Sequence, residues 1–135
     1  MSEKKITVLD LLDLDLKGQD SLNMKCIAGR SGLYREITVS DINRPGLAIS
    51  GFYESFAYER VQLFGRGESA YLRKLESEGN FDLIKKFFTY EMPCIVFSHS
   101  IEPSEFFLSV AESSRCAVLQ TDLISTDFSQ RLLRV

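Results

Sequence analysis

In the second half of the chain, short apolar runs alternate with longer segments of helical periodicity, and this order limits the possible folds more than any other feature. The apolar runs are Val61–Phe64, Cys94–Phe97 and Ala117–Leu119. Hydrophobic spacing predicts helices over 68–75, over 80–88, in the segment whose first turn holds Pro103, and over 125–135. Strands that alternate with helices pair in parallel through right-handed crossovers. We therefore expect an α/β fold with a small parallel or mixed sheet flanked by helices.

The first part of the chain combines a helix signal with two strand candidates. Thr7 and Asp10 stand in a capping-box-like relation at the start of a periodic segment, and Lys17-Gly18 is typical of a helix end. Met24–Ala28 and Arg35–Val39 follow as the strand candidates. The residues between these two runs are turn formers, which predicts either a hairpin or an open corner.

Composition excludes several classes of function. The chain has 16 basic and 19 acidic residues and no basic run, so we expect no nucleic-acid partner. It has no apolar stretch near the length of about 20 residues that a membrane span requires, so we expect no membrane association. Cys26, Cys94 and Cys116 are odd in number and widely spaced, which favours reduced thiols in a cytoplasmic protein. His99 is the one histidine, and we expect no metal site.

A glycine pair follows the first apolar run. Residues 65–70 fit the pattern G-x-G-x-x-A, which in dinucleotide-binding proteins brings backbone N–H groups close to a pyrophosphate. Glu68, however, places a carboxylate in the first turn of the next helix, where it would repel a phosphate. No acidic residue closes the following strand to bind a ribose. A tight strand-to-helix turn therefore explains the pattern better than a dinucleotide site.

We find no self-contained catalytic constellation in the sequence. The phosphate-binding pattern G-x-x-x-x-G-K-[ST] is absent, because no Gly-Lys pair occurs in the chain. His99 follows a strand between Ser98 and Ser100, a place where sheet proteins carry functional groups. A loop histidine satisfied by solvent or by a backbone carbonyl is the simpler interpretation.

Residues 40–52 form the most unusual stretch of the sequence. Pro45-Gly46 predicts a turn, and aromatic residues gather directly after it. The structural interpretation, which the spacing favours, is a corner that packs these aromatics. The functional interpretation is a loop that binds an anion or another small ligand through Ser40, Arg44 and free backbone N–H groups.

The same stretch carries a resemblance to a known family. The block R-P-G-L-x-x-x-G starts at Arg44, E-R-x-Q-x-x-G starts at Glu59, and Glu68–Leu72 follows. In this order the blocks resemble the N-terminal domain of bacterial HPr kinase/phosphorylase, and the resemblance runs over nearly the whole chain. One departure is Gly67, where the family would carry another residue.

The resemblance implies a bifunctional cytoplasmic enzyme that phosphorylates a serine of the phosphocarrier HPr and reverses the reaction by phosphorolysis. In such an enzyme, ATP and Mg²⁺ bind to a P-loop in a C-terminal kinase domain, and the parent is a homohexamer. The chain would then comprise an N-terminal regulatory or structural domain, residues 1–124, and the start of a connector helix, residues 125–135. It would hold no cofactor and no catalytic residue of its own.

The role of the N-terminal domain itself stays open at this point. Its family fold is similar to the uridine-nucleotide-binding domain of muramyl ligases, and that similarity implies that Ser40, Arg44 and Gly46 hold a small anionic ligand. The opposing hypothesis is a ligand-free structural module that spaces or regulates the kinase domains in the oligomer, with an exposed apolar patch near Phe52, Tyr53 and Tyr58. A free-standing sensor of the same fold, without a kinase, is the alternative to the enzyme.

Overall fold

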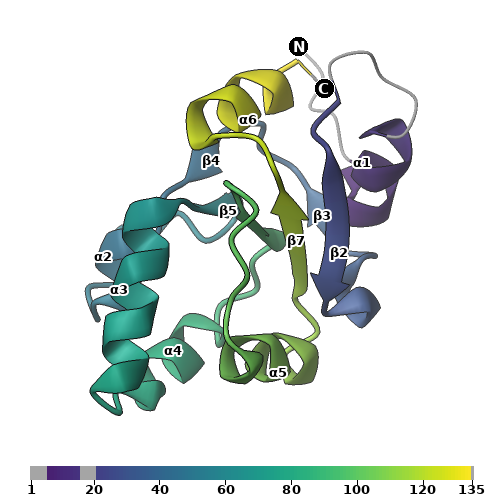
Figure 1. The fold of residues 1–135 in the computed structure, drawn as a ribbon. Helices are drawn as coiled ribbons and strands as arrows, with labels where there is room; N and C mark the ends of the chain where they lie inside the picture. The colour runs from purple at the N-terminus through teal and green to yellow at the C-terminus, as the bar shows by residue number, and fades with distance from the viewer. Residues whose placement is uncertain (1–5, 16–20, 135) are drawn as a thin grey trace.

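A computed structural model describes residues 6–15 and 21–134 of the chain. The strands are β1 (Ile6–Thr7), β2 (Met24–Ala28), β3 (Glu36–Ile37), β4 (Ile42–Asn43), β5 (Val61–Phe64), β6 (Cys94–Phe97) and β7 (Ala117–Thr121). The helices are α1 (Val8–Asp15), α2 (Gly46–Ile49), α3 (Arg66–Ser77), α4 (Phe81–Phe87), α5 (Glu105–Ser113) and α6 (Ser125–Leu132), with a 3₁₀ turn at Arg30–Gly32. Figure 1 shows their arrangement.

The main sheet has five strands in the order β2-β7-β6-β5-β4. The strands β4, β5, β6 and β7 are mutually parallel, whereas β2 pairs with β7 in the antiparallel direction. The expected α/β fold is confirmed. Of the two kinds of sheet that the sequence allowed, parallel or mixed, the structure has the mixed one. Because the four parallel strands run in one direction, their carboxyl ends meet at one edge of the sheet.

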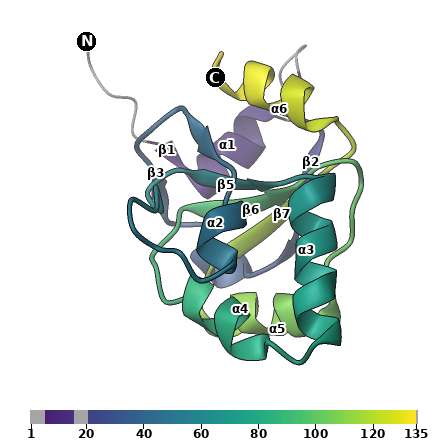
Figure 2. The same cartoon turned by 90° about the vertical axis from the view of Figure 1, so that its left-hand side faces the viewer.

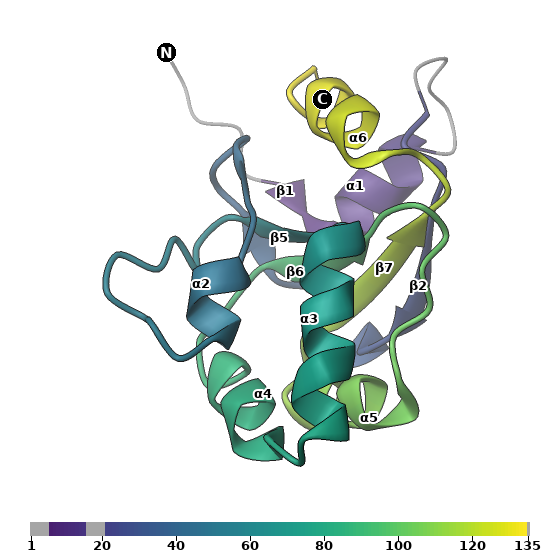
Figure 3. The same ribbon diagram turned by 60° about the vertical axis from the view of Figure 1, so that its left-hand side comes forward.

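Helices cover both faces of this sheet. In Figure 2, α1 and α6 lie above the strands, and α2, α3, α4 and α5 lie below them; Figure 3 shows the latter group from the side. Side chains alternate between the faces, as the period of a strand requires. Leu63 and Val96 pack towards α1 and α6, whereas Phe64 and Phe97 pack towards the larger helical layer. Because the parallel strands are buried on both faces, their sequences are continuous apolar runs and do not alternate between apolar and polar residues.

Aromatic rings fill the centre of the larger layer. Phe64 stacks on Phe97 with ring centroids 4.9 Å apart, and both rings meet Phe107 of α5 edge-on. Each fully buried side chain of this size contributes about 1.5–3 kcal/mol to folding. The ends of β5 and β6 are therefore held in fixed positions, and so are the polar residues that follow them.

The connection after β2 is an open corner and not a hairpin. Glu36–Ile37 is shorter than the expected strand, and it pairs with β1 in a separate two-stranded sheet. Gly29 has a φ of 70°, and a Cβ atom there would lie 1.9 Å from the carbonyl oxygen of Cys116. The chain therefore turns at Gly29 against the neighbouring backbone, which leads it away from β2.

Several helix starts differ from the expected ones for local reasons. Thr7 and Asp10 do form reciprocal hydrogen bonds of 3.0 Å, which confirms the capping relation at α1. Helix α3 begins at Arg66, because the Glu68 side chain accepts the N–H of Gly65 and stabilises an earlier turn. Pro103 lies outside α5, since Ser104 is the N-cap. The expected helix end at Lys17-Gly18, and Val135, lie outside the described residues.

Within residues 6–15 and 21–134, no helix is long and apolar enough to cross a membrane. The same residues contain no group of three or more histidine, cysteine, aspartate or glutamate side chains that could hold a metal ion.

Candidate functional site at the carboxyl edge of the sheet

Polar residues that are far apart in the sequence gather at the carboxyl edge of the parallel strands. Arg44 follows β4, Gly65 follows β5, Ser98 follows β6, and Ser125 begins the helix after β7. An ideal Cβ on Gly65 would lie 2.6 Å from Arg44 Nη2 and 2.7 Å from Ser125 Oγ, so these side chains converge on the Gly65 backbone. We call this group, together with Glu68, the carboxyl-edge cluster.

Arg44 and Glu68 form a bidentate ion pair within this cluster. The Nε and Nη2 atoms of Arg44 donate to Oε2 and Oε1 of Glu68, each over 2.9 Å. The Arg44 side chain is 43% exposed and that of Glu68 is 12% exposed. Bidentate pairing orients the guanidinium, and the same geometry suits a phosphate or a carboxylate of a ligand.

Glu68 also caps helix α3. Its Oε1 atom accepts the N–H of Gly65 over 2.9 Å. Partial burial raises the pKa of Glu68, but hydrogen bonds from Arg44 and from backbone N–H groups outweigh that effect, so its pKa lies below the ordinary value. Glu68 is therefore ionised at neutral pH, and its charge suits the positive end of the helix dipole. An anionic ligand at this helix start would have to compete with it.

The two glycines of the G-x-G pattern have different surroundings. Gly65 has a φ of −96°, which any residue can adopt, and the space for a Cβ there is taken by Arg44 and Ser125. Gly67 has no atom within 4 Å of an ideal Cβ. The N–H of Gly65 is already bonded to Glu68. These contacts support the interpretation of the pattern as a tight turn.

His99 belongs to the same edge. Ser98 is fully buried, and its hydroxyl lies 2.9 Å from His99 Nδ1 and 2.7 Å from Ser125 Oγ. His99 and Ser100 both have positive φ angles, 58° and 55°. Their N–H groups donate to the carbonyl oxygens of Leu123 and Thr121 over 2.9 Å, which holds this sparsely populated backbone conformation in place.

The three expected ligand residues are only partly brought together. Arg44 belongs to the carboxyl-edge cluster, whereas Ser40 lies on an exposed bend before β4, and Gly46 is the first residue of α2. Among the described residues, no hydrogen bond joins Ser40 to Arg44 or Gly46. A cavity of about 80 Å³ opens between α2 and the segment after it. Its lining includes Asn43, Arg44, Pro45, Leu47, Phe52 and Phe56.

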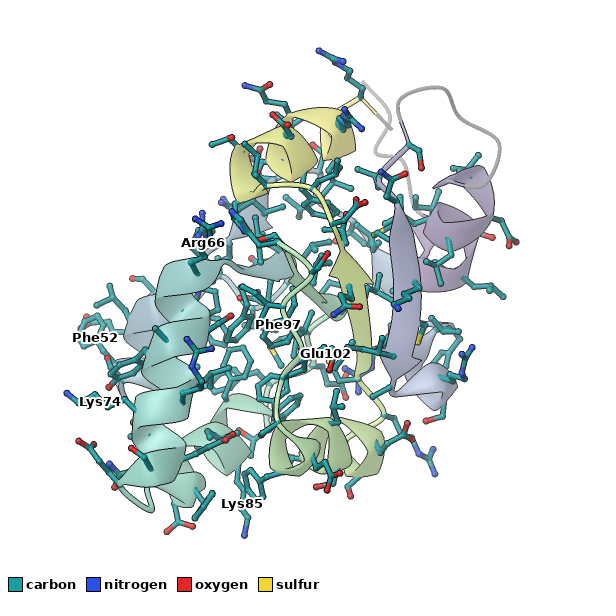
Figure 4. All side chains as sticks on the ribbon, viewed as in Figure 1. Phe52, Arg66, Lys74, Lys85, Phe97 and Glu102 are labelled. Atoms are coloured by element: carbon teal, nitrogen blue, oxygen red, sulfur yellow. The ribbon has the colours of Figure 1, made fainter. Side chains whose placement is uncertain are left out.

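The residues beside this cavity expose an apolar surface. Leu47, Phe52 and Tyr58 are 70%, 51% and 44% exposed, and Figure 4 shows Phe52 on the outer side of the molecule. We call these three residues the α2 surface. Behind it, Tyr53 stacks on Tyr90 with centroids 5.0 Å apart, and burial together with the neighbouring Tyr90 raises the pKa of Tyr53 to about 12.

A larger groove of about 460 Å³ lies at the opposite, amino edge of the sheet. Three glutamates line it, Glu36, Glu59 and Glu91, beside the exposed ring of Tyr34. Arg35 also lines the groove, but its guanidinium donates to the carbonyl oxygens of Met92 and Ser114 over 2.7 and 2.8 Å. The groove is thus predominantly acidic, whereas the carboxyl edge carries the ion pair of Arg44 and Glu68. None of the residues expected to hold a ligand lines the groove.

A solved structure has a similar fold. It contains the CBS and DRTGG domains of the regulatory region of Clostridium perfringens pyrophosphatase, complexed with its activator, diadenosine tetraphosphate. The TM-score is 0.56 at 11% sequence identity, and the match covers 93% of this chain and 44% of that chain. At this identity the similarity concerns the fold alone.

Sequence relatives are named HPr kinase/phosphorylase. The protein from Treponema pallidum is 54% identical over 93% of this chain and 39% of its own length. The proteins from Leptospira biflexa and Shouchella clausii are each 34% identical, over 84% and 95% of this chain. The chain spans 35% to 39% of the length of these three relatives. The family model described as HPr Serine kinase N terminus matches residues 6–135. The chain belongs to the HPr serine kinase N-terminus family.

Proposed function

We propose that this chain is the N-terminal domain of a bifunctional HPr kinase/phosphorylase. The parent enzyme phosphorylates a serine of HPr with ATP or pyrophosphate and removes the phosphate by phosphorolysis, and in this way it regulates carbon metabolism in the cytoplasm. The observation that carries the proposal is the 54% identity to the Treponema pallidum relative over 93% of this chain.

In this proposal, catalysis belongs to the part of the parent enzyme beyond this chain. The chain contains no Gly-Lys pair and hence no P-loop of the usual pattern, so ATP and Mg²⁺ are assigned to a C-terminal kinase domain. Residues 1–124 are the regulatory or structural domain, and α6, within residues 125–135, starts the connector. The chain alone is inactive, and the parent assembles into a homohexamer.

For the domain itself, we propose a regulatory ligand site centred on Arg44, which lines the 80 Å³ cavity. Ser40 and Gly46, the other two residues expected to hold the ligand, do not line this cavity, so they belong to the proposal through the sequence alone. The Arg44 guanidinium is oriented by Glu68 and remains 43% exposed, so an anionic group can approach it from solvent. The fold similarity to a pyrophosphatase regulatory region is consistent with a regulatory role, although the ligand of that protein does not transfer by fold alone.

A second candidate role is oligomerisation through the α2 surface. Leu47, Phe52 and Tyr58 expose apolar side chains within a stretch of twelve residues, and Leu47 and Phe52 line one cavity. Exposed apolar patches often mark protein interfaces. If this role holds, Phe52→Glu reduces self-association of the full-length protein in analytical ultracentrifugation. Phe81→Glu, at a separate exposed phenylalanine on α4, is the matched control and leaves the oligomer unchanged.

The enzymatic proposal is tested with the full-length gene product, HPr, ATP and Mg²⁺. We expect transfer of phosphate to a serine of HPr, and release of pyrophosphate when phosphorylated HPr is incubated with inorganic phosphate. The 135-residue chain is the control and should catalyse neither reaction. A full-length protein that is folded but transfers no phosphate to HPr would contradict the proposal.

The ligand site is tested separately by thermal shift with inorganic phosphate, pyrophosphate and ATP. We expect at least one of these anions to raise the melting temperature of the chain, and Arg44→Ala to abolish the rise. Lys85→Ala removes a positive charge from exposed α4, away from the carboxyl edge, and should preserve it. A rise that persists in Arg44→Ala would exclude Arg44 from the site.

A further inference from the structure

Ser69 of α3 differs from Ser77 and Ser109 in that its hydroxyl makes no hydrogen bond to its own helix. Serines within helices commonly donate to a carbonyl of the preceding turn. Ser77 and Ser109 do so, with bonds of 2.8 Å to the carbonyl oxygens of Lys74 and Phe106. The Ser69 hydroxyl is buried, and it has no hydrogen-bond partner among the described residues. The large majority of buried hydroxyl groups are hydrogen-bonded, to protein groups or to ordered water, so the Ser69 hydroxyl calls for an explanation.

Ser69 lines a small cavity between α3 and the segment 98–104. The cavity has a volume of about 30 Å³, and one water molecule requires about 10–15 Å³ by the same measure. Besides Ser69, its lining has an apolar part, formed by Leu72, Phe97, Ile101, Pro103 and Phe107, and polar groups from Arg73, Glu76, Glu102 and Ser104. Figure 4 shows Phe97 in the interior beside α3, with Glu102 on the neighbouring segment. The cavity is therefore large enough for about two water molecules and has the polar groups to bind them.

Hydrogen bonds fasten the segment 98–104 in its middle and at its end. In its middle, Gln120 Nε2 donates to the carbonyl oxygens of Ser100 and Ile101 over 3.2 and 2.8 Å. At its end, Ser104 Oγ donates to Glu76 Oε2 of α3 over 2.7 Å. The cavity is lined by residues 101–104 of the segment and by residues of α3. A molecule in the cavity can therefore link this part of the segment to the helix.

We propose that this cavity is a binding site for ordered water, which joins the Ser69 hydroxyl to polar groups of the segment 98–104. The water bridges α3 and residues 101–104 of the segment, which line the cavity. Ser69 is thus a positioning residue for the connection between β6 and α5. This inference is independent of the proposed kinase function.

The first test is a high-resolution crystal structure of the 135-residue chain. We expect a water oxygen about 2.7–3.0 Å from Ser69 Oγ, with at least one further contact to the segment 98–104. An empty cavity, or a Ser69 hydroxyl rotated onto the carbonyl oxygen of Gly65, would overturn the proposal.

The second test compares Ser69→Ala with Ser109→Ala by hydrogen exchange. Both changes remove a helical hydroxyl, but the Ser109 hydroxyl is exposed and bonded to its own helix. We expect Ser69→Ala to accelerate exchange of the Ile101 and Glu102 amides, which lie in the part of the segment that lines the cavity, by up to about tenfold, since one bridging interaction is lost. Ser109→Ala should leave these amides unchanged. Unchanged exchange in Ser69→Ala would overturn the proposal.

The change in melting temperature on Ser69→Ala has opposite signs for a cavity that holds water and for one that is dry. Removing a hydroxyl that has no partner stabilises a protein, whereas removing one bound to water destabilises it. Relative to Ser109→Ala, which shares the gain in helix propensity, Ser69→Ala should melt about 2–5 °C lower. A higher melting temperature than that of Ser109→Ala would show that the site is dry.

Discussion

The carboxylate of Glu68 holds the guanidinium of Arg44 through two hydrogen bonds of 2.9 Å, although 24 residues separate the two in sequence. The same carboxylate caps α3 through the N–H of Gly65. One acidic side chain thus fixes the start of a helix and the orientation of a cation at the carboxyl edge. An anionic ligand would accept hydrogen bonds from the same groups as Glu68, the guanidinium of Arg44 and the N–H of Gly65. Glu68 therefore competes with any anion that binds there and lowers its affinity.

Arg44→Ala leaves a mostly buried carboxylate without its main partner. The loss of stability is moderate, because Arg44 is 43% exposed and solvent screens its ion pair with Glu68. We expect a loss of about 1 kcal/mol in the free energy of unfolding, which lowers the melting temperature by about 3–5 °C. Calorimetry of the variant measures it. A loss of stability of this size without any change in the response to anions would reduce Arg44 to a structural role.

Glu68→Gln keeps the shape of the side chain but removes the competing charge. If the ligand site at Arg44 exists, the variant should bind inorganic phosphate or pyrophosphate more tightly than the wild type, because the guanidinium then lacks its carboxylate. Isothermal titration calorimetry of both proteins provides the comparison. Weaker binding in Glu68→Gln would mean that Glu68 supports the site rather than competes for it.

The pH dependence of stability follows from the lowered pKa of Glu68. A carboxylate whose folded pKa lies below its unfolded pKa stabilises the protein above the unfolded value, about 4.3. This contribution is lost as the pH falls through the folded pKa. The stability advantage of the wild type over Glu68→Gln should therefore be constant near pH 7 and shrink below about pH 4. Urea unfolding across this range measures it, and an advantage that grows in acid would contradict the assignment.

Gly65 and Gly67 provide a matched pair of substitutions. A Cβ at Gly65 would displace Arg44 or Ser125, so Gly65→Ala should cost about 1–2 kcal/mol. Gly67 lies inside α3 with free space around it, so Gly67→Ala should stabilise by up to about 1 kcal/mol through helix propensity. Denaturant unfolding of the two variants measures both. Equal effects would show that the close approach at Gly65 is unimportant.

The three thiols should differ in reactivity. Burial raises the pKa of Cys94 and that of Cys116, the latter to about 12. Cys26 is only half-buried; burial raises its pKa too, against an opposing hydrogen bond to Ala28. Because the thiolate is the reactive form, a thiol reagent should label Cys26 first and the other two only as the protein unfolds. Mass spectrometry of partly labelled protein identifies the order.

The fold could be predicted where the sequence signal is local. Val61–Phe64 and Cys94–Phe97 are buried on both faces, so their continuous apolar runs identified β5 and β6 correctly. The strand β4 was missed, because its two residues lie among turn formers and pair only with β5. The pairing of β3 with β1 was missed for a similar reason, since short edge pairings leave little pattern in the sequence.

The candidate site could be predicted only in part. Arg44 was identified through the turn formers around it, and His99 through its position after a strand. Glu68 was recognised as a charge at a helix start, but its bond to Arg44 depends on the pairing of β4 with β5. The contact between Ser98 and Ser125 joins residues 27 positions apart. Neither contact leaves a local signal in the sequence.

The most direct test of the central claim is to sequence the encoding gene beyond codon 135. We predict that the reading frame continues and encodes G-x-x-x-x-G-K-[ST] within a few tens of residues, as an attached kinase domain requires. A stop codon directly after codon 135 would contradict the account. The chain would then be a free-standing ligand-sensing or oligomerisation module of the same family.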